Sequence, residues 1–131
     1  MKKLLCLLAL CGAASAHAYS AKELLEDCTA ADQYYTQNSD TEPSTRAARC
    51  IAYLMGIADG YAISDYLAEK VGVKLNAFCL PRESDLAERL VRATLNHIEH
   101  MPPNTTASTA TLVASAFGKS FSCPDSLESK K

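Results

Sequence analysis

The sequence predicts an all-α domain, a small four-helix bundle stapled by two disulfide bonds. Four segments with helical periodicity follow one another, joined by polar or proline-containing connections, and no strand with a partner is visible. Four cysteines follow the first 18 residues, an even number in a short chain with an export signal. The 131 residues, 48% of them hydrophobic, suffice for one core and no more.

The N-terminus has the pattern of a cleavable Sec signal peptide. Lys2 and Lys3 precede an apolar stretch that is too short to cross a membrane. Small residues follow and offer two A-x-A cleavage signals, at 14–16 and at 16–18. The sequence therefore predicts export to the periplasm, with cleavage after one of these two signals.

We divide the chain into a signal peptide at 1–18, a helical domain at 19–124 and a polar tail at 125–131. The leader holds two of the 13 basic residues and none of the 15 acidic ones, so the mature chain is mildly acidic. An acidic chain without a basic cluster argues against nucleic acid or an anionic membrane surface as a partner. No later stretch is long and apolar enough to suggest a membrane span.

The first helix is expected from about Ser20 to Tyr35. Ser20 is a plausible N-cap, and Glu23 stands at the spacing of a capping box. Its apolar stripe consists of Leu24, Leu25, Cys28 and Ala31. A polar linker, TQNSDTEPST, separates this helix from the next.

The second helix is expected from about Thr45 to Lys70, and it carries small side chains at every fourth position. These are Ala48, Ala52, Gly56, Gly60 and Ser64. A glycine inside a helix costs about 1 kcal/mol relative to alanine. We interpret Ala52, Gly56 and Gly60 as a close-packing ridge that lets another helix approach within the domain. Packing against a second copy of the chain is the alternative.

The third and fourth helices follow a stretch, VGVKLNAF, that we interpret as a loop. The third begins near Ser84, a good N-cap, and must end at the prolines of MPPN. The fourth begins between Thr105 and Ser108 and ends at Ser122-Cys123-Pro124. The short proline turn between them predicts an antiparallel hairpin.

The layout of the helices favours one pairing of the four cysteines. Cys79 and Cys123 lie just beyond the outer ends of the antiparallel hairpin, so they should be neighbours. Cys28 and Cys50 would then join the first two helices. Each bond would stabilise the domain by roughly 3 to 4 kcal/mol. Two other pairings remain possible.

The sequence shows no catalytic, metal or cofactor site. His97 and His100 are three residues apart, whereas the histidines of a zinc-protease helix are four apart. Paired cysteines leave no thiol nucleophile, and no G-x-S-x-G elbow is present. The residues favour a binding module over an enzyme.

Several motifs together resemble a known family. Cys50 is followed by AYLMGIADGY, and then come FCLP at 78–81, Met101-Pro102 and LVASAFGKSFSC at 112–123. In these motifs the sequence resembles the Rap/Tai family, periplasmic immunity proteins of type VI secretion amidase effectors. The resemblance covers roughly residues 45–124. It implies a helical, disulfide-stapled domain, often dimeric, that occludes the active site of a cognate peptidoglycan amidase.

Two connections are candidates for contacting such a partner. In EHMPPNT the prolines reduce the entropy lost on binding, and the segment from Lys74 to Glu83 is pinned by its cysteine and proline. The candidate contact residues are Glu99, His100, Met101 and Asn104 in the first, and Lys74, Asn76 and Arg82 in the second. The alternative for both segments is a solvated connector.

A small periplasmic chaperone of the acid-activated kind is the alternative function. It would share the export signal, the helices and the disulfides. It predicts that acid exposes apolar surface, whereas an immunity protein forms a complex with one effector. An enzyme is the least favoured reading.

Overall fold

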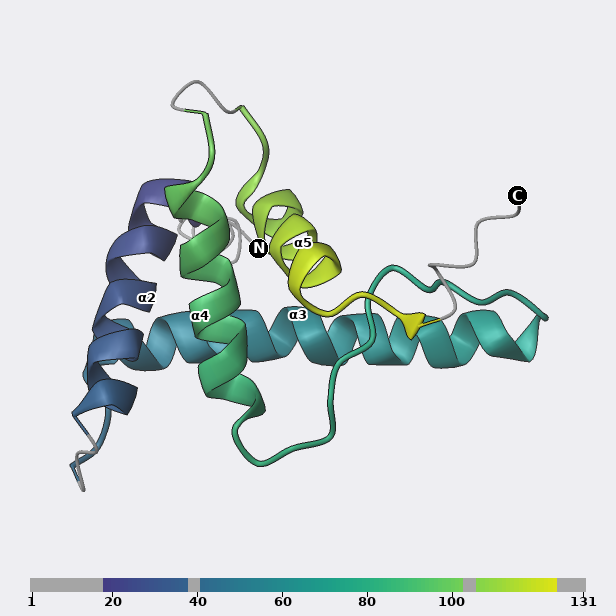
Figure 1. The fold of residues 1–131 in the computed structure, drawn as a ribbon, viewed down its shortest axis with the longest axis horizontal. Coiled ribbons are helices and arrows are strands. Elements are labelled where there is room, and N and C mark those ends of the chain that lie inside the picture. The colour runs from purple at the N-terminus through teal and green to yellow at the C-terminus, as the bar shows by residue number, and fades with distance from the viewer. Residues whose placement is uncertain (1–17, 38–40, 103–105, 125–131) are drawn as a thin grey trace, which may run out of the picture.

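Four helices and their connections make up the part of the chain that the structure describes (Figure 1). The structure is a computed structural model, and it describes residues 18–37, 41–102 and 106–124. The helices are α2 (Ala21–Thr36), α3 (Thr45–Lys70), α4 (Leu86–Glu99) and α5 (Thr109–Ser120). The all-α prediction is confirmed. The predicted leader up to residue 17, the tail from residue 125 and Asn104 lie outside the described residues.

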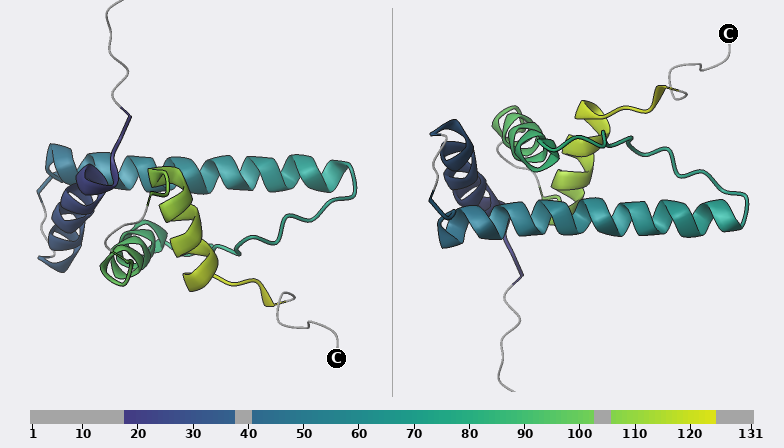
Figure 2. Two further views of the ribbon diagram at one scale, coloured as in Figure 1. Left: turned by 90° about the horizontal axis from the view of Figure 1, so that it is seen from above. Right: turned by 90° about the horizontal axis from the view of Figure 1, so that it is seen from below.

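Helix α3 is the axis of the molecule, and the other three helices pack across its first half (Figures 1 and 2). The buried residues of α3 are Ala47, Cys50, Leu54 and Ala58, all before residue 59. The second half of α3 projects beyond the other helices, and residues 71–85 return alongside it towards α4. No helix in the described ranges combines the length and the apolar character needed to cross a membrane.

Three helices begin at the serine caps that their sequences suggest. The Ser20 hydroxyl accepts a hydrogen bond from the Glu23 amide, and the Glu23 carboxylate accepts one from the Ser20 amide, which completes the capping box. Ser44 and Ser108 cap α3 and α5 through their hydroxyls. The predicted cap at Ser84 is wrong. Ser84 lies in a turn, and α4 begins at Leu86 without a side-chain capping bond.

The core lies where α2, α4 and α5 meet the first half of α3. Its largest members are Phe117, Leu24, Leu54, Leu90, Val91 and Val113. The returning segment also contributes to this core through Phe78, which is 5% exposed. The core therefore extends to the base of the projecting region and fixes its position.

Both predicted disulfides are confirmed. Cys28–Cys50 joins α2 to α3, and both of its cysteines are fully buried, at 0% exposure. Cys79–Cys123 joins the returning segment to the chain that follows α5. The first bond holds the helices together, and the second closes the base of the projecting region.

The interpretation of the small-residue ridge as an interior packing surface is wrong. Ala48, Ala52, Gly56, Gly60 and Ser64 are all exposed. A Cβ added at Gly56 or Gly60 would meet no atom within 4 Å. The other helices contact the opposite face of α3, where Cys50, Leu54 and Ala58 lie. Within this chain the two glycines are therefore not required for close packing.

Gly118, and not Gly56 or Gly60, is the glycine at which two backbone segments approach each other closely. A Cβ at Gly118 of α5 would lie 3.4 Å from the backbone oxygen of Ala77. This contact seats the returning segment directly on α5. The role of Gly118 could not be predicted from the sequence, because Ala77 is 41 residues away along the chain and no helical pattern relates the two.

Candidate functional site

The projecting region is the candidate binding surface, and we call residues 59–82 the arm. It consists of the second half of α3 and the segment that returns along it (Figure 2). Among the described residues, the large apolar side chains that are exposed lie in the arm with the exception of Leu25. They are Ile63, Tyr66, Leu67, Val71, Val73 and Leu75. A concentration of exposed apolar side chains on one element is typical of an interaction surface.

Side chains of α3 hold the returning segment in place. The Asp65 carboxylate accepts a hydrogen bond from the Leu75 amide at 3.3 Å. Two residues further, the Ala77 amide donates to the Tyr61 hydroxyl at 2.9 Å. The Tyr61 ring also stacks on Phe78, with 3.9 Å between ring centroids. The segment is therefore tied to the helix at successive points.

The base of the arm is fixed to α5. Phe78 packs edge-on against Phe117, with ring centroids 5.5 Å apart. The Cys79 amide donates to the Phe121 carbonyl at 2.7 Å, next to the Cys79–Cys123 disulfide. A surface held in this way loses little conformational entropy when a partner binds.

The tip of the arm turns through two residues in the left-handed region. Gly72 has φ +78°, and Asn76 has φ +47°. Asparagine tolerates this conformation better than most residues, which accounts for an Asn between the two tethered amides of Leu75 and Ala77. Lys74 and Asn76 are both exposed here. Lys74 and Asn76, two of the contact residues predicted from the sequence, therefore lie in a loop of defined conformation.

A groove of about 580 Å³ lies between the two parts of the arm. One wall is α3, with Asp59, Asp65 and Glu69 beside Tyr61 and Tyr66. The other wall is the end of the returning segment and the start of α4, with Phe78, Leu80, Pro81, Arg82 and Leu86. The groove thus has an acidic wall and a mainly apolar wall.

The two predicted contact loops lie at different ends of the molecule (Figure 1). Lys74 and Asn76 belong to the arm, and Arg82 lines its groove. Glu99 and His100 are exposed at the far end of α4, and Met101 beside them is half-buried. The two regions are far apart in the molecule, so we treat them as separate candidates.

The two histidines at the end of α4 form no metal-ligand cluster with other residues that the structure describes. The His100 imidazole lies 2.7 Å from the Asn96 carbonyl, which occupies its Nδ1 atom. Partial burial, together with nearby Lys119, lowers the pKa of His97. In the part of the chain that the structure describes, no three His, Cys, Asp or Glu side chains are placed to hold a metal ion.

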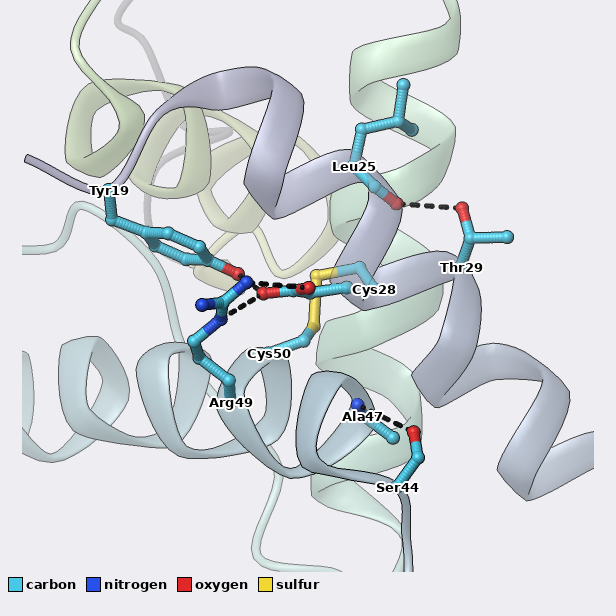
Figure 3. The surroundings of a disulfide bond; sticks show 9 residues. Tyr19, Leu25, Cys28, Thr29, Ser44, Ala47, Arg49 and Cys50 are labelled. Carbon is cyan, nitrogen blue, oxygen red and sulfur yellow. Dashed lines mark hydrogen bonds and ion pairs between the residues drawn. A yellow bond between two sulfur atoms is a disulfide. The ribbon is translucent and has the colours of Figure 1, made fainter.

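An ion pair between a buried carboxylate and a half-exposed arginine lies beside the Cys28–Cys50 disulfide (Figure 3). The Asp27 carboxylate, 1% exposed, accepts hydrogen bonds from two guanidinium nitrogens of Arg49 and from the Tyr19 hydroxyl. The Tyr19 carbonyl accepts a further bond from the Thr109 hydroxyl at 2.6 Å. These contacts tie the chain before α2 to α3 and α5.

The pKa values in this cluster follow from its contacts. The Arg49 hydrogen bonds lower the pKa of Asp27, and they outweigh burial, which acts in the opposite direction. Burial raises the pKa of the Tyr19 hydroxyl, and its hydrogen bond to Asp27 raises it further. No helical pattern or motif in the sequence predicts this cluster. One feature of the sequence does point to this ion pair: Asp27 and Arg49 each directly precede a cysteine of the same predicted disulfide.

Comparison with known proteins identifies the family. A family model described as Rap1a immunity proteins matches residues 20–123. No curated protein and no solved structure matches the chain. The matched residues include all four helices, both disulfides and the whole arm. The chain therefore belongs to the Rap1a immunity protein family.

Proposed function

We propose that this chain is a periplasmic immunity protein that binds a cognate peptidoglycan amidase effector of a type VI secretion system and occludes its active site. Membership of the Rap1a immunity protein family supports the general role. The preorganised, exposed arm is the observation that carries the mechanism. Occlusion requires only a surface that an incoming substrate cannot displace, and no catalytic group on this chain.

The arm supports this role better than the far end of α4. Asp65, Tyr61 and the Cys79–Cys123 disulfide fix its returning segment at three places. Its apolar side chains provide area whose burial against a partner is favourable, at about 25 cal/mol per Å². Lys74 and Asn76 at the tip are the polar residues that would meet the effector. Glu99, His100 and Met101 are then a second, peripheral contact.

The two disulfides support a periplasmic location. Disulfides form and persist in oxidising compartments and are rare in the cytosol of most organisms. The predicted leader would take the chain to such a compartment. Mass spectrometry of the periplasmic fraction measures both the cleavage position and the oxidation state of the four cysteines.

We also propose that α3 pairs with α3 of a second copy. Its exposed stripe carries small residues in the first half and large apolar residues in the second half. In an antiparallel pair centred between residues 59 and 60, Ile63, Leu67 and Val71 would lie opposite small positions of the partner. Those positions are Gly56, Ala52 and Ala48 respectively. The stripe is thus complementary to itself, as a twofold interface requires.

Co-expression tests the proposed function. We expect cells that produce a periplasm-directed amidase, encoded beside the gene for this chain, to survive when the chain is also exported. The two proteins should elute together from a sizing column. Continued lysis without a complex would contradict the proposal.

Two double variants that change charge and polarity then show which region of the chain contacts the effector. Lys74→Glu with Leu75→Asp should abolish rescue, because both changes alter the exposed tip of the arm. Glu99→Lys with His100→Glu is the matched control at the far end of α4, and it should retain most of the protection. The reverse outcome would assign the contact to α4 instead.

The chaperone alternative makes a different prediction about acid. The arm already exposes apolar side chains in this folded state, so no acid-triggered opening is needed for binding. An environment-sensitive dye should therefore bind similarly at neutral and mildly acidic pH. A large increase in dye binding on acidification, with protection of unrelated client proteins, would favour the chaperone.

A further inference from the structure

We propose that the groove of the arm receives a basic segment of the effector, one in which apolar side chains stand next to lysine or arginine. This inference rests on the proposed function and adds the chemistry of the partner. It is carried by the charges on one wall of the groove, the apolar character of the other wall and the way in which the walls are fixed.

The acidic wall offers three carboxylates that form no ion pair with any residue in the described part of the chain. Asp59 and Glu69 are exposed, and their carboxylates have no ion pair or hydrogen bond with any other residue that the structure describes. Asp65, between them, accepts a hydrogen bond from the Leu75 amide and lines the same groove. Acidic residues elsewhere commonly have basic partners, as in Glu26, Asp27, Asp32, Glu83 and Glu88.

The opposite wall suits the hydrocarbon part of the same segment. Phe78, Leu80 and Pro81 present apolar surface across the groove from the carboxylates. Lysine and arginine lay their aliphatic stems on apolar surface while the charged head reaches a polar group. The volume of about 580 Å³ is within the usual range of binding clefts, roughly 300 to 1,000 Å³.

Arg82 makes the distribution of charge in the groove asymmetric. It stands on the wall opposite the three carboxylates, so a cationic head of the partner is repelled there and attracted towards α3. On α3 itself, Lys70 lies over the Tyr66 ring, 4.7 Å from its centroid, at the edge of the groove. A partner cation is therefore best placed near Asp59 and Asp65, away from Lys70.

The groove does not need to form when the partner arrives. The Cys79–Cys123 disulfide and the Phe78–Phe117 contact hold the apolar wall, while α3 is a continuous helix along the other. A charged, preformed cleft mainly accelerates association and makes it dependent on salt. Charge-dependent binding of this kind also discriminates between a cognate effector and an effector that carries an acidic segment at the same place.

Neutral variants test the inference without altering the fold. Asp59→Asn with Glu69→Gln removes two groove charges from exposed side chains that have no partner in the described chain. Glu42→Gln with Asp85→Asn is the matched control, because it removes the same charge from exposed positions that do not line the groove. Binding to the effector identified by the co-expression assay is measured by surface plasmon resonance at about 50 mM and about 500 mM salt.

We expect the groove variant to bind roughly tenfold more weakly at low salt, mostly through slower association, and the loss to shrink at high salt. The control should change affinity less than about twofold. Wild-type affinity in the groove variant, or an equal loss in the control, would overturn the inference and leave the proposed function intact. A change in self-association instead of effector binding would assign the groove to a second copy and also overturn it. If the unaltered chain forms no complex, the proposed function fails and the inference fails with it.

Discussion

The buried carboxylate of Asp27 accepts hydrogen bonds from two nitrogens of the Arg49 guanidinium, and each residue lies one position before a cysteine of the same disulfide. The Cys28–Cys50 bond therefore brings the charged pair together as it joins α2 to α3. Removal of one partner would leave the other charge without its hydrogen bonds. This pair is where folding stability should depend most directly on pH.

We predict that Asp27→Asn destabilises the protein at neutral pH and that its effect fades in acid. The folded-state pKa of Asp27 is lowered, whereas an unfolded aspartate titrates near about 3.9. The ionised carboxylate thus contributes stability above the unfolded pKa, and this contribution is lost as pH falls through the folded pKa. Urea unfolding of both proteins at pH 7 and below pH 4 measures the difference. An undiminished difference in acid would contradict the ion-pair account.

We predict that Thr94→Val stabilises the fold. Thr94 is fully buried in α4, and its hydroxyl has no hydrogen-bond partner among the residues that the structure describes. A buried polar group without a partner costs about 1 to 3 kcal/mol, so its removal should raise the free energy of unfolding by about 1 kcal/mol. Thermal unfolding should show a midpoint a few degrees higher.

Thr29→Val is the matched control for that change. Thr29 is exposed on α2, and its hydroxyl donates to the Leu25 carbonyl at 2.7 Å. This substitution should give no comparable gain. If Thr94→Val instead destabilises the protein, the Thr94 hydroxyl has a partner, such as a bound water.

We predict that alanine at the α3 glycines stabilises the fold, whereas a large side chain at position 56 weakens self-association. Gly56→Ala with Gly60→Ala places each Cβ in open space, so the helix should gain up to about 1 kcal/mol per site. The proposed α3 pair needs a small residue at position 56, so Gly56→Leu should weaken the dimer in analytical ultracentrifugation. Ala62→Leu is the control on a different side of the same helix. Unchanged self-association in both leucine variants would contradict this pairing.

We predict that the two disulfides stabilise different parts of the molecule. Replacing Cys79 and Cys123 by serine removes a link of sequence separation 44, which costs about 4 kcal/mol in the chain-entropy model. Hydrogen exchange should then accelerate at the amides of Leu75 and Ala77, because the base of the arm is no longer closed. The same replacement at Cys28 and Cys50 should spare those amides relative to α2. Equal acceleration in both variants would show that the arm is not a separately held element.

The helices could be predicted from the sequence because their caps and stops are local features. The disulfides could be predicted because four cysteines allow few pairings. Serine caps, a capping box and proline stops lie within a few residues of the helix ends that they determine. The pairing of Cys79 with Cys123 followed from the short turn between the last two helices. The cap at Ser84 was wrong because a neighbouring turn delays α4 to Leu86.

The candidate site could not be predicted from helical periodicity, because periodicity does not show which side of a helix other elements will cover. The repeat of small residues on α3 was recognised, but the side on which the other helices would pack was not, so Gly56 and Gly60 were assigned to the interior. Lys74, Asn76 and Arg82 were predicted from the pinned segment that carries them. The groove required the tertiary contacts of Tyr61 and Phe78, which bring two walls together from separate parts of the chain.

The central claim is that the arm of this chain covers the active site of a peptidoglycan amidase. The most direct measurement is the rate at which the purified effector cleaves isolated cell-wall sacculi as the oxidised chain is added. The account predicts that cleavage stops near one chain per effector and that Lys74→Glu with Leu75→Asp restores it. Undiminished cleavage in the presence of excess folded, oxidised chain would contradict the account.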